Sequence, residues 1–91
     1  MTTIRVGPLE IPVEYRDLGH GTFGKFHQFP TPRIEINETA PEPMRALALL
    51  HECIHALFDL HGIHATEQTV ATLEMVLARF VRDNPHVFAS L

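Results

Sequence analysis

The hydrophobic pattern of this chain changes its period once, near residue 40, and that change limits the folds available to it. Before that point, apolar and polar residues alternate at residues 4–6, 9–15 and 33–37, with a further candidate strand at 23–29. Alternation with period two is typical of strands that have one buried face. Pro12 cannot donate to a β-ladder and predicts that its strand lies at an edge. Residues 1–40 therefore predict a small antiparallel sheet of three to four strands.

After residue 40 the apolar residues recur at helical spacing. Pro41, Glu42 and Pro43 suit the first turn of a helix. The pattern predicts a first helix from Glu42 to Leu60, ended by Gly62. The apolar stripe that it should bury consists of Leu47, Leu50, Ile54 and Leu57.

A second helix is expected to follow Thr66, a good N-cap residue, and to end at Asn84-Pro85. Its apolar stripe consists of Val70, Leu73, Leu77, Phe80 and Val81. Together the helices should form a packed hairpin within residues 41–85. The chain, residues 1–91, is therefore expected to be a single α+β domain with a small core.

Composition argues against several classes of function. The net charge is −4 and the seven Lys and Arg residues are scattered along the sequence, so no nucleic-acid surface is expected. No apolar stretch approaches the ~20 residues of a membrane span, and no signal-peptide pattern opens the sequence. One cysteine, Cys53, cannot form an internal disulfide. These features predict a soluble cytoplasmic protein with no membrane partner.

The first predicted helix carries the pattern HExxH, from His51 to His55. Positions i and i+4 lie on one side of a helix, so both imidazoles can approach one Zn²⁺ at about 2.0–2.1 Å. Glu52 lies about 100° round the helix from His51, where it can reach a zinc-bound water better than the metal. We therefore expect His51 and His55 as metal ligands at the margin of the core, and Glu52 as a catalytic general base.

A catalytic zinc takes three protein ligands and keeps one position open. His61 would complete an HExxHxxxxxH pattern, although Phe58 stands where that pattern has a glycine. Glu67 and Glu74 of the second helix are the alternatives, and periodicity does not separate them. Cys53 is interpreted as a small buried hydrophobic residue.

Several segments resemble small HExxH proteins encoded in bacteriophage and prophage genomes, which are regarded as minimal zincin-like metallopeptidases. The resemblance covers roughly residues 33–85 and is carried by residues 49–56, 62–63, 66–67 and 82–85. It implies a gluzincin-like site in which Glu67 is the third ligand beside His51 and His55. It also implies a phage origin and a peptide or protein substrate, which could pair with the strand from Ile34 to Asn37. Cys53 departs from the family pattern, where an aliphatic residue is common.

The leading hypothesis is a zinc-dependent metallopeptidase, in which Glu52 activates a water and passes its proton to the leaving amine. His27 or His64 could act as a further proton donor. One alternative is a metal-dependent hydrolase of a non-peptide substrate, because His51, His55 and His61 also match the spacing of small bacterial metalloproteins of ribosomal RNA maturation. The other alternative is a non-catalytic zinc-binding adaptor with a closed four-ligand site.

Overall fold

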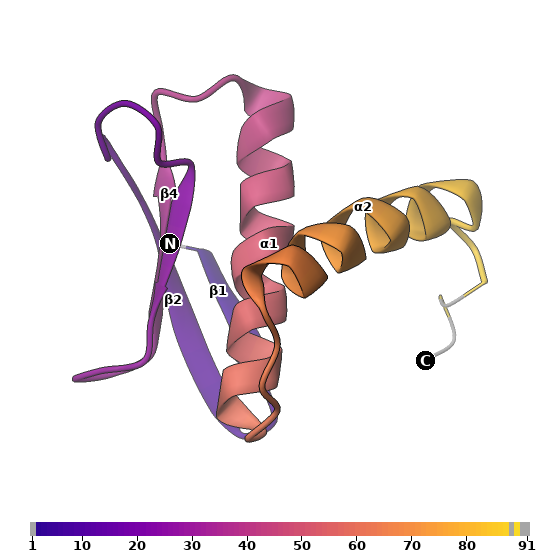
Figure 1. The fold of residues 1–91 in the computed structure, drawn as a ribbon, viewed down its shortest axis with the longest axis horizontal. Coiled ribbons are helices and arrows are strands. Elements are labelled where there is room, and N and C mark those ends of the chain that lie inside the picture. The colour runs from indigo at the N-terminus through magenta and orange to yellow at the C-terminus, as the bar shows by residue number, and fades with distance from the viewer. Residues whose placement is uncertain (1, 88, 90–91) are drawn as a thin grey trace.

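The computed structural model describes residues 2–87 and 89, and within them four strands are followed by two helices (Figure 1). The elements are β1 (Thr2–Val6), β2 (Leu9–Arg16), β3 (Gly24–His27), β4 (Arg33–Asn37), α1 (Glu42–Leu60) and α2 (Glu67–Asp83). The predicted α+β class and the predicted bounds of α1 are confirmed.

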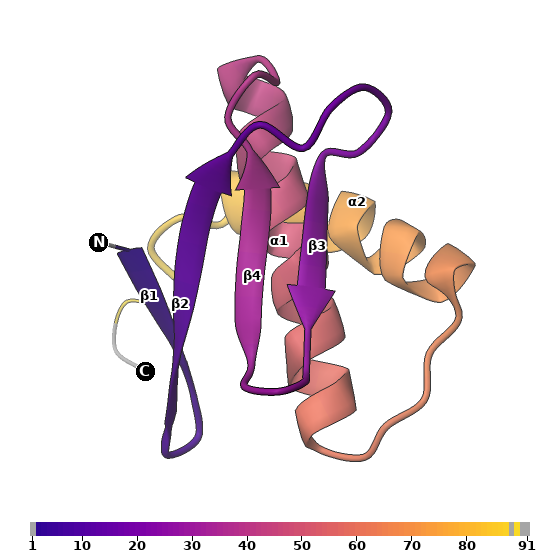
Figure 2. The same cartoon turned by 90° about the vertical axis from the view of Figure 1, so that its left-hand side faces the viewer.

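The sheet is mixed, and the prediction of a wholly antiparallel sheet was wrong. The strand order is β1-β2-β4-β3 (Figure 2). The outer pairs, β1 with β2 and β3 with β4, are antiparallel, whereas β2 and β4 are parallel. The parallel pair arises because the chain passes from β2 to the far edge, forms β3 there, and returns as β4 between the two.

This topology also reverses the expected positions of two strands. The strand that contains Pro12 is an inner strand, and the proline is tolerated because the pairing of β2 with β4 begins one residue later, at Val13 and Ile34. The segment from Ile34 to Asn37 is paired on both sides, so it cannot receive an added strand. Among the described residues, the outer strands of the sheet are β1 and β3.

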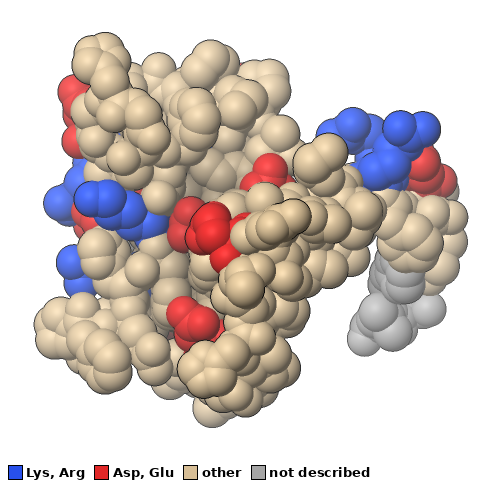
Figure 3. Space-filling model, viewed as in Figure 1, with Lys and Arg blue, Asp and Glu red and all other residues tan. Residues whose placement is uncertain are grey.

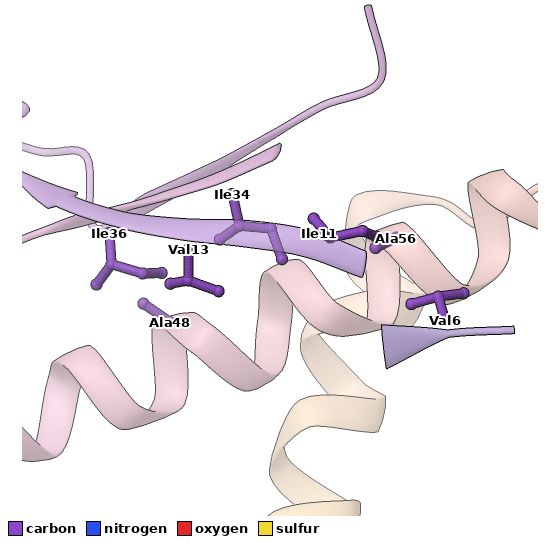
Figure 4. Packing of buried hydrophobic residues seen from close by; sticks show 7 residues of the cluster. All are labelled: Val6, Ile11, Val13, Ile34, Ile36, Ala48 and Ala56. Carbon is purple, nitrogen blue, oxygen red and sulfur yellow. The ribbon is translucent and has the colours of Figure 1, made fainter. Parts of the chain in front are cut away.

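The core lies between one face of the sheet and α1. Figure 4 shows isoleucine and valine side chains of the sheet directed at Ala48 and Ala56 of the helix. The buried cluster is Val6, Ile11, Val13, Ile34, Ile36, Ala48 and Ala56. Because alanine has a short side chain, the helix backbone can approach the sheet closely at these two positions.

The face of α1 that meets the sheet is not the predicted stripe. Of the four predicted residues only Ile54 is buried, and Leu57 is 44% exposed. The sheet instead meets Ala48, Glu52 and Ala56. The prediction of the buried face was wrong because α1 has two neighbours, the sheet on one side and α2 on another. Apolar residues on both faces were read as one stripe, and the direction of that stripe lies between the two faces.

The second helix crosses α1 near its middle and then leads away from it, rather than forming the expected hairpin (Figures 1 and 2). Thr66 is the N-cap, and its side chain accepts a hydrogen bond from the Thr69 N–H, as predicted. Within α2 as described, Val70 is the one buried residue, so its stripe is not the predicted core: Phe80 and Val81 are about half exposed. Neither described helix has the length and apolarity needed to cross a membrane.

The outer face of the sheet carries ion pairs to a buried carboxylate. Glu35 of β4 is 7% exposed and pairs with Arg16 Nε at 3.1 Å and with His27 Nε2 at 2.6 Å. Burial by itself raises the pKa of Glu35, but the His27 hydrogen bond and the charges of Arg16 and Arg33 outweigh it and lower the pKa below its usual value of 4.5.

This lowered pKa makes stability depend on pH. Because the folded protein holds Glu35 ionised, its contribution is present above about pH 4.5 and is lost as the pH falls through the lowered pKa. We expect Glu35→Gln to reduce the free energy of unfolding by about 1–2 kcal/mol at pH 7 and by progressively less below pH 4.5. Denaturant unfolding from pH 7 to pH 3 measures the difference.

Glu10→Gln is the matched control, because Glu10 forms an exposed ion pair with Arg5 on the same sheet. Its effect should stay below about 0.5 kcal/mol throughout the pH range. A Glu35→Gln effect that grew as the pH fell would contradict the prediction.

Candidate metal centre

His51 and His55 lie one turn apart on α1 and face α2 rather than the sheet. Their ring centroids are 4.9 Å apart, and the rings are inclined by 63°. The side chains are 17% and 22% exposed, so both are largely enclosed yet remain accessible. The i, i+4 spacing thus brings the two imidazoles together as the sequence predicts.

Glu67, the first residue of α2, joins both histidines. After Gly62 the chain runs back along α1, so that α2 begins level with the middle of that helix (Figure 1). One carboxylate oxygen of Glu67 contacts His51 Nε2, and the other lies 3.0 Å from His55 Nε2. One ligand atom from each of the three residues lies within 4.8 Å of the others, and this group can hold a metal ion. Two imidazole nitrogens and a carboxylate oxygen form a donor set that suits Zn²⁺.

Glu74 supports His51 from the other side of the ring. Its Oε1 lies 2.7 Å from His51 Nδ1, and the carboxylate is 20% exposed. A carboxylate at Nδ1 directs Nε2 toward the ligand group. Burial lowers the pKa of His51, but the hydrogen bonds to Glu74 and Glu67 and the charge of Glu52 raise it above its usual value. The two glutamates that periodicity could not separate therefore have different positions, one at each nitrogen of His51.

The other histidines considered from the sequence lie elsewhere. His61 caps the end of α1, where its Nδ1 contacts the Leu57 carbonyl oxygen, and it is not part of the ligand group. His64 is exposed in the connection between the helices. His27 pairs with Glu35 on the face of the sheet opposite α1, so it cannot act as a proton donor in this site.

Glu52 is turned toward the sheet and is only 8% exposed. Burial raises the pKa of its carboxyl group, while His51, His55 and a hydrogen bond from the Phe26 backbone N–H oppose that rise. Sequence reasoning missed this contact with β3, because no local pattern shows which strand lies beside the helix.

A cavity of about 260 Å³ lies beside Glu52 and two of the candidate ligands, His51 and Glu67. Residues 21–24 form one wall, and the first half of α1 forms another with Met44, Leu47 and Ala48. His51, Glu52, Glu67 and Glu74 complete the lining. Figure 3 shows acidic side chains gathered where α2 begins, whereas basic side chains lie on the sheet side and at the far end of α2. The cavity is therefore apolar on one side and acidic on the other.

Comparisons with protein-family models, with curated proteins and with solved structures found no match for this chain. The interpretation of the site accordingly depends on its own residues.

The ligand group predicts which variants lose metal. In His51→Ala and His55→Ala we expect the zinc content to fall from about one ion per chain to nearly none, because each substitution removes one of three ligands. For the same reason, Glu67→Ala should bind zinc much more weakly. Zinc analysis of purified protein after dialysis measures this. His61→Ala is the matched control and should keep its zinc. Full zinc in His55→Ala, or its loss in His61→Ala, would contradict the assignment.

The contact between Glu74 and His51 Nδ1 predicts a weaker effect. Glu74→Ala should reduce zinc affinity by about 10–100-fold without abolishing binding, because it removes the orienting carboxylate but no ligand. Competition with a chromogenic chelator gives the affinity. Gln68→Ala changes an exposed residue of the same helix and should leave the affinity unaltered. Equal affinities for the two variants would rule out the orienting role.

Proposed function

We propose that this chain is a zinc-dependent metallopeptidase with His51, His55 and Glu67 as metal ligands and Glu52 as general base. One observation carries the proposal: the buried Glu52 side chain lines the same cavity as His51 and Glu67, two of the three candidate ligands. A purely structural zinc site does not require an enclosed carboxylate beside it. The likeness to phage-encoded zincin-like proteins supports the same chemistry and remains a prediction.

When bound, Zn²⁺ would supply Lewis acidity to the substrate carbonyl and lower the pKa of a water toward about 7. Glu52 would take a proton from that water and deliver it to the leaving amine nitrogen. Burial raises the pKa of the Glu52 carboxyl group, which makes its carboxylate a stronger proton acceptor than an exposed one. His51, with its ring oriented by Glu74, would keep its Nε2 available as a ligand.

The proposed substrate is an extended peptide. Its place beside the metal centre would be the outer edge of β3, since β4 is enclosed between two strands. Strand β3 packs against α1 and leads from the cavity wall formed by residues 21–24. Backbone pairing at this edge would hold a peptide along the cavity without a requirement for one particular sequence.

The three-ligand arrangement favours an enzyme over an adaptor with a closed site. Among the described residues, the ligand group contains no fourth histidine, cysteine or carboxylate, and Glu74 contacts His51 from the opposite ring nitrogen. An open coordination position is what a catalytic zinc requires.

The test is Glu52→Gln in zinc-loaded protein. We expect it to retain about one zinc per chain and to lose at least about 100-fold in the rate of peptide hydrolysis, because the amide cannot accept the proton. Mass spectrometry of a library of unstructured peptides identifies the cleaved bonds and measures the rate. Asp59→Asn changes an exposed acid of the same helix and should keep wild-type activity. Unchanged hydrolysis in Glu52→Gln would overturn the proposed function.

A further inference from the structure

Gly24 in β3 has no side chain at the point where Glu52 approaches the strand. A β-carbon added to Gly24 would lie 3.1 Å from Glu52 Cγ, 3.2 Å from the Glu35 carbonyl oxygen and 3.2 Å from Ile36 Cδ1. The backbone of Gly24 does not have the positive φ that favours glycine, unlike Gly7, Gly19, Gly21 and Gly62. Close packing rather than backbone conformation therefore favours glycine here.

The backbone of the same strand directs polar groups toward its outer edge. The Asn37 N–H donates to the Phe23 carbonyl oxygen at 2.8 Å, which makes this a hydrogen-bonded pair across β3 and β4. Because bonded and non-bonded pairs alternate in an antiparallel ladder, the backbone groups of Gly24 and Phe26 point toward the outer edge of β3. The Phe26 N–H therefore faces the side of β3 where it helps to oppose the rise in the pKa of Glu52 that burial causes.

We propose that Gly24 is a positioning residue for the general base: its missing side chain admits the Glu52 stem against β3 and so keeps the carboxylate in the cavity that both residues line. This inference rests on the proposed function for its catalytic meaning. A free glutamate side chain samples many rotamers. Contact along its stem keeps Glu52 beside His51 and Glu67, where a misplacement of about 1 Å can cost 100-fold in rate.

A double-mutant cycle in the zinc-free protein tests the contact. Gly24→Ala, Glu52→Ala and the double variant are unfolded with urea in the presence of EDTA, so that bound metal does not affect the comparison. Gly24→Ala should lower the folding equilibrium constant at least about threefold more when residue 52 is glutamate than when it is alanine. The control cycle pairs Gly24→Ala with Asp59→Ala, an exposed position of α1, and should be additive.

Additive effects of the Gly24 and Glu52 substitutions would overturn the inference, because Gly24 would then matter only for its contacts with β4. If Gly24→Ala does not fold, the test is whether the Gly24→Ala, Glu52→Ala double variant folds. Recovery of folding on removal of the Glu52 side chain supports the contact, and an equally unfolded double variant overturns it.

Zinc-loaded protein separates this inference from the proposed function. Gly24→Ala should bind zinc within about twofold of wild type, while its kcat falls at least about tenfold with a smaller change in KM. A wild-type kcat retained in Gly24→Ala would overturn the positioning role. If the wild type cleaves no peptide, the proposed function fails, whereas the coupling measured in the EDTA cycle still decides whether Gly24 positions Glu52.

Discussion

The two-sided packing of α1 determines the arrangement of the rest of the molecule. One face of the helix lies on the sheet through Ala48 and Ala56, whose short side chains permit a close approach. The neighbouring face meets α2. Because HExxH spans both faces, its residues are divided between two environments. His51 and His55 turn toward α2 and become potential ligands, while Glu52 turns toward the edge of the sheet and is buried.

The contacts of α2 are concentrated at its N-terminal half. Within α2 only Val70 is recorded as buried, and Glu67 and Glu74 contact His51 from its two ring nitrogens. The carboxylates at the start of α2 therefore serve both helix docking and the candidate metal centre. A metal held by this group would join the two helices directly, so that binding and the placement of α2 would be linked. Farther along the helix, Leu77 and Val81 remain substantially exposed.

Local features of the fold could be predicted well, whereas its topology could not. The bounds of α1 and the Thr66 cap follow from residues within a few positions of one another. Strand order depends instead on the path of the chain after β2. The alternation of apolar and polar residues predicts where strands form, but it does not predict their order in the sheet. The strand containing Pro12 is consequently inner rather than outer, and β4 is enclosed between neighbours. The expected hairpin failed for the same reason, because the connection after Gly62 sets where α2 begins.

The sequence by itself determined that His51 and His55 share one side of a helix, since 3.6 residues per turn place i and i+4 together in any α-helix. Helical periodicity does not separate Glu67 from Glu74 as the third ligand, and Phe58 argues against His61. Tertiary structure distinguished them, because only the path between the helices brings Glu67 to both imidazoles and Glu74 to the far side of one. It also decided that Glu52 is buried against β3, where Gly24 leaves space for it.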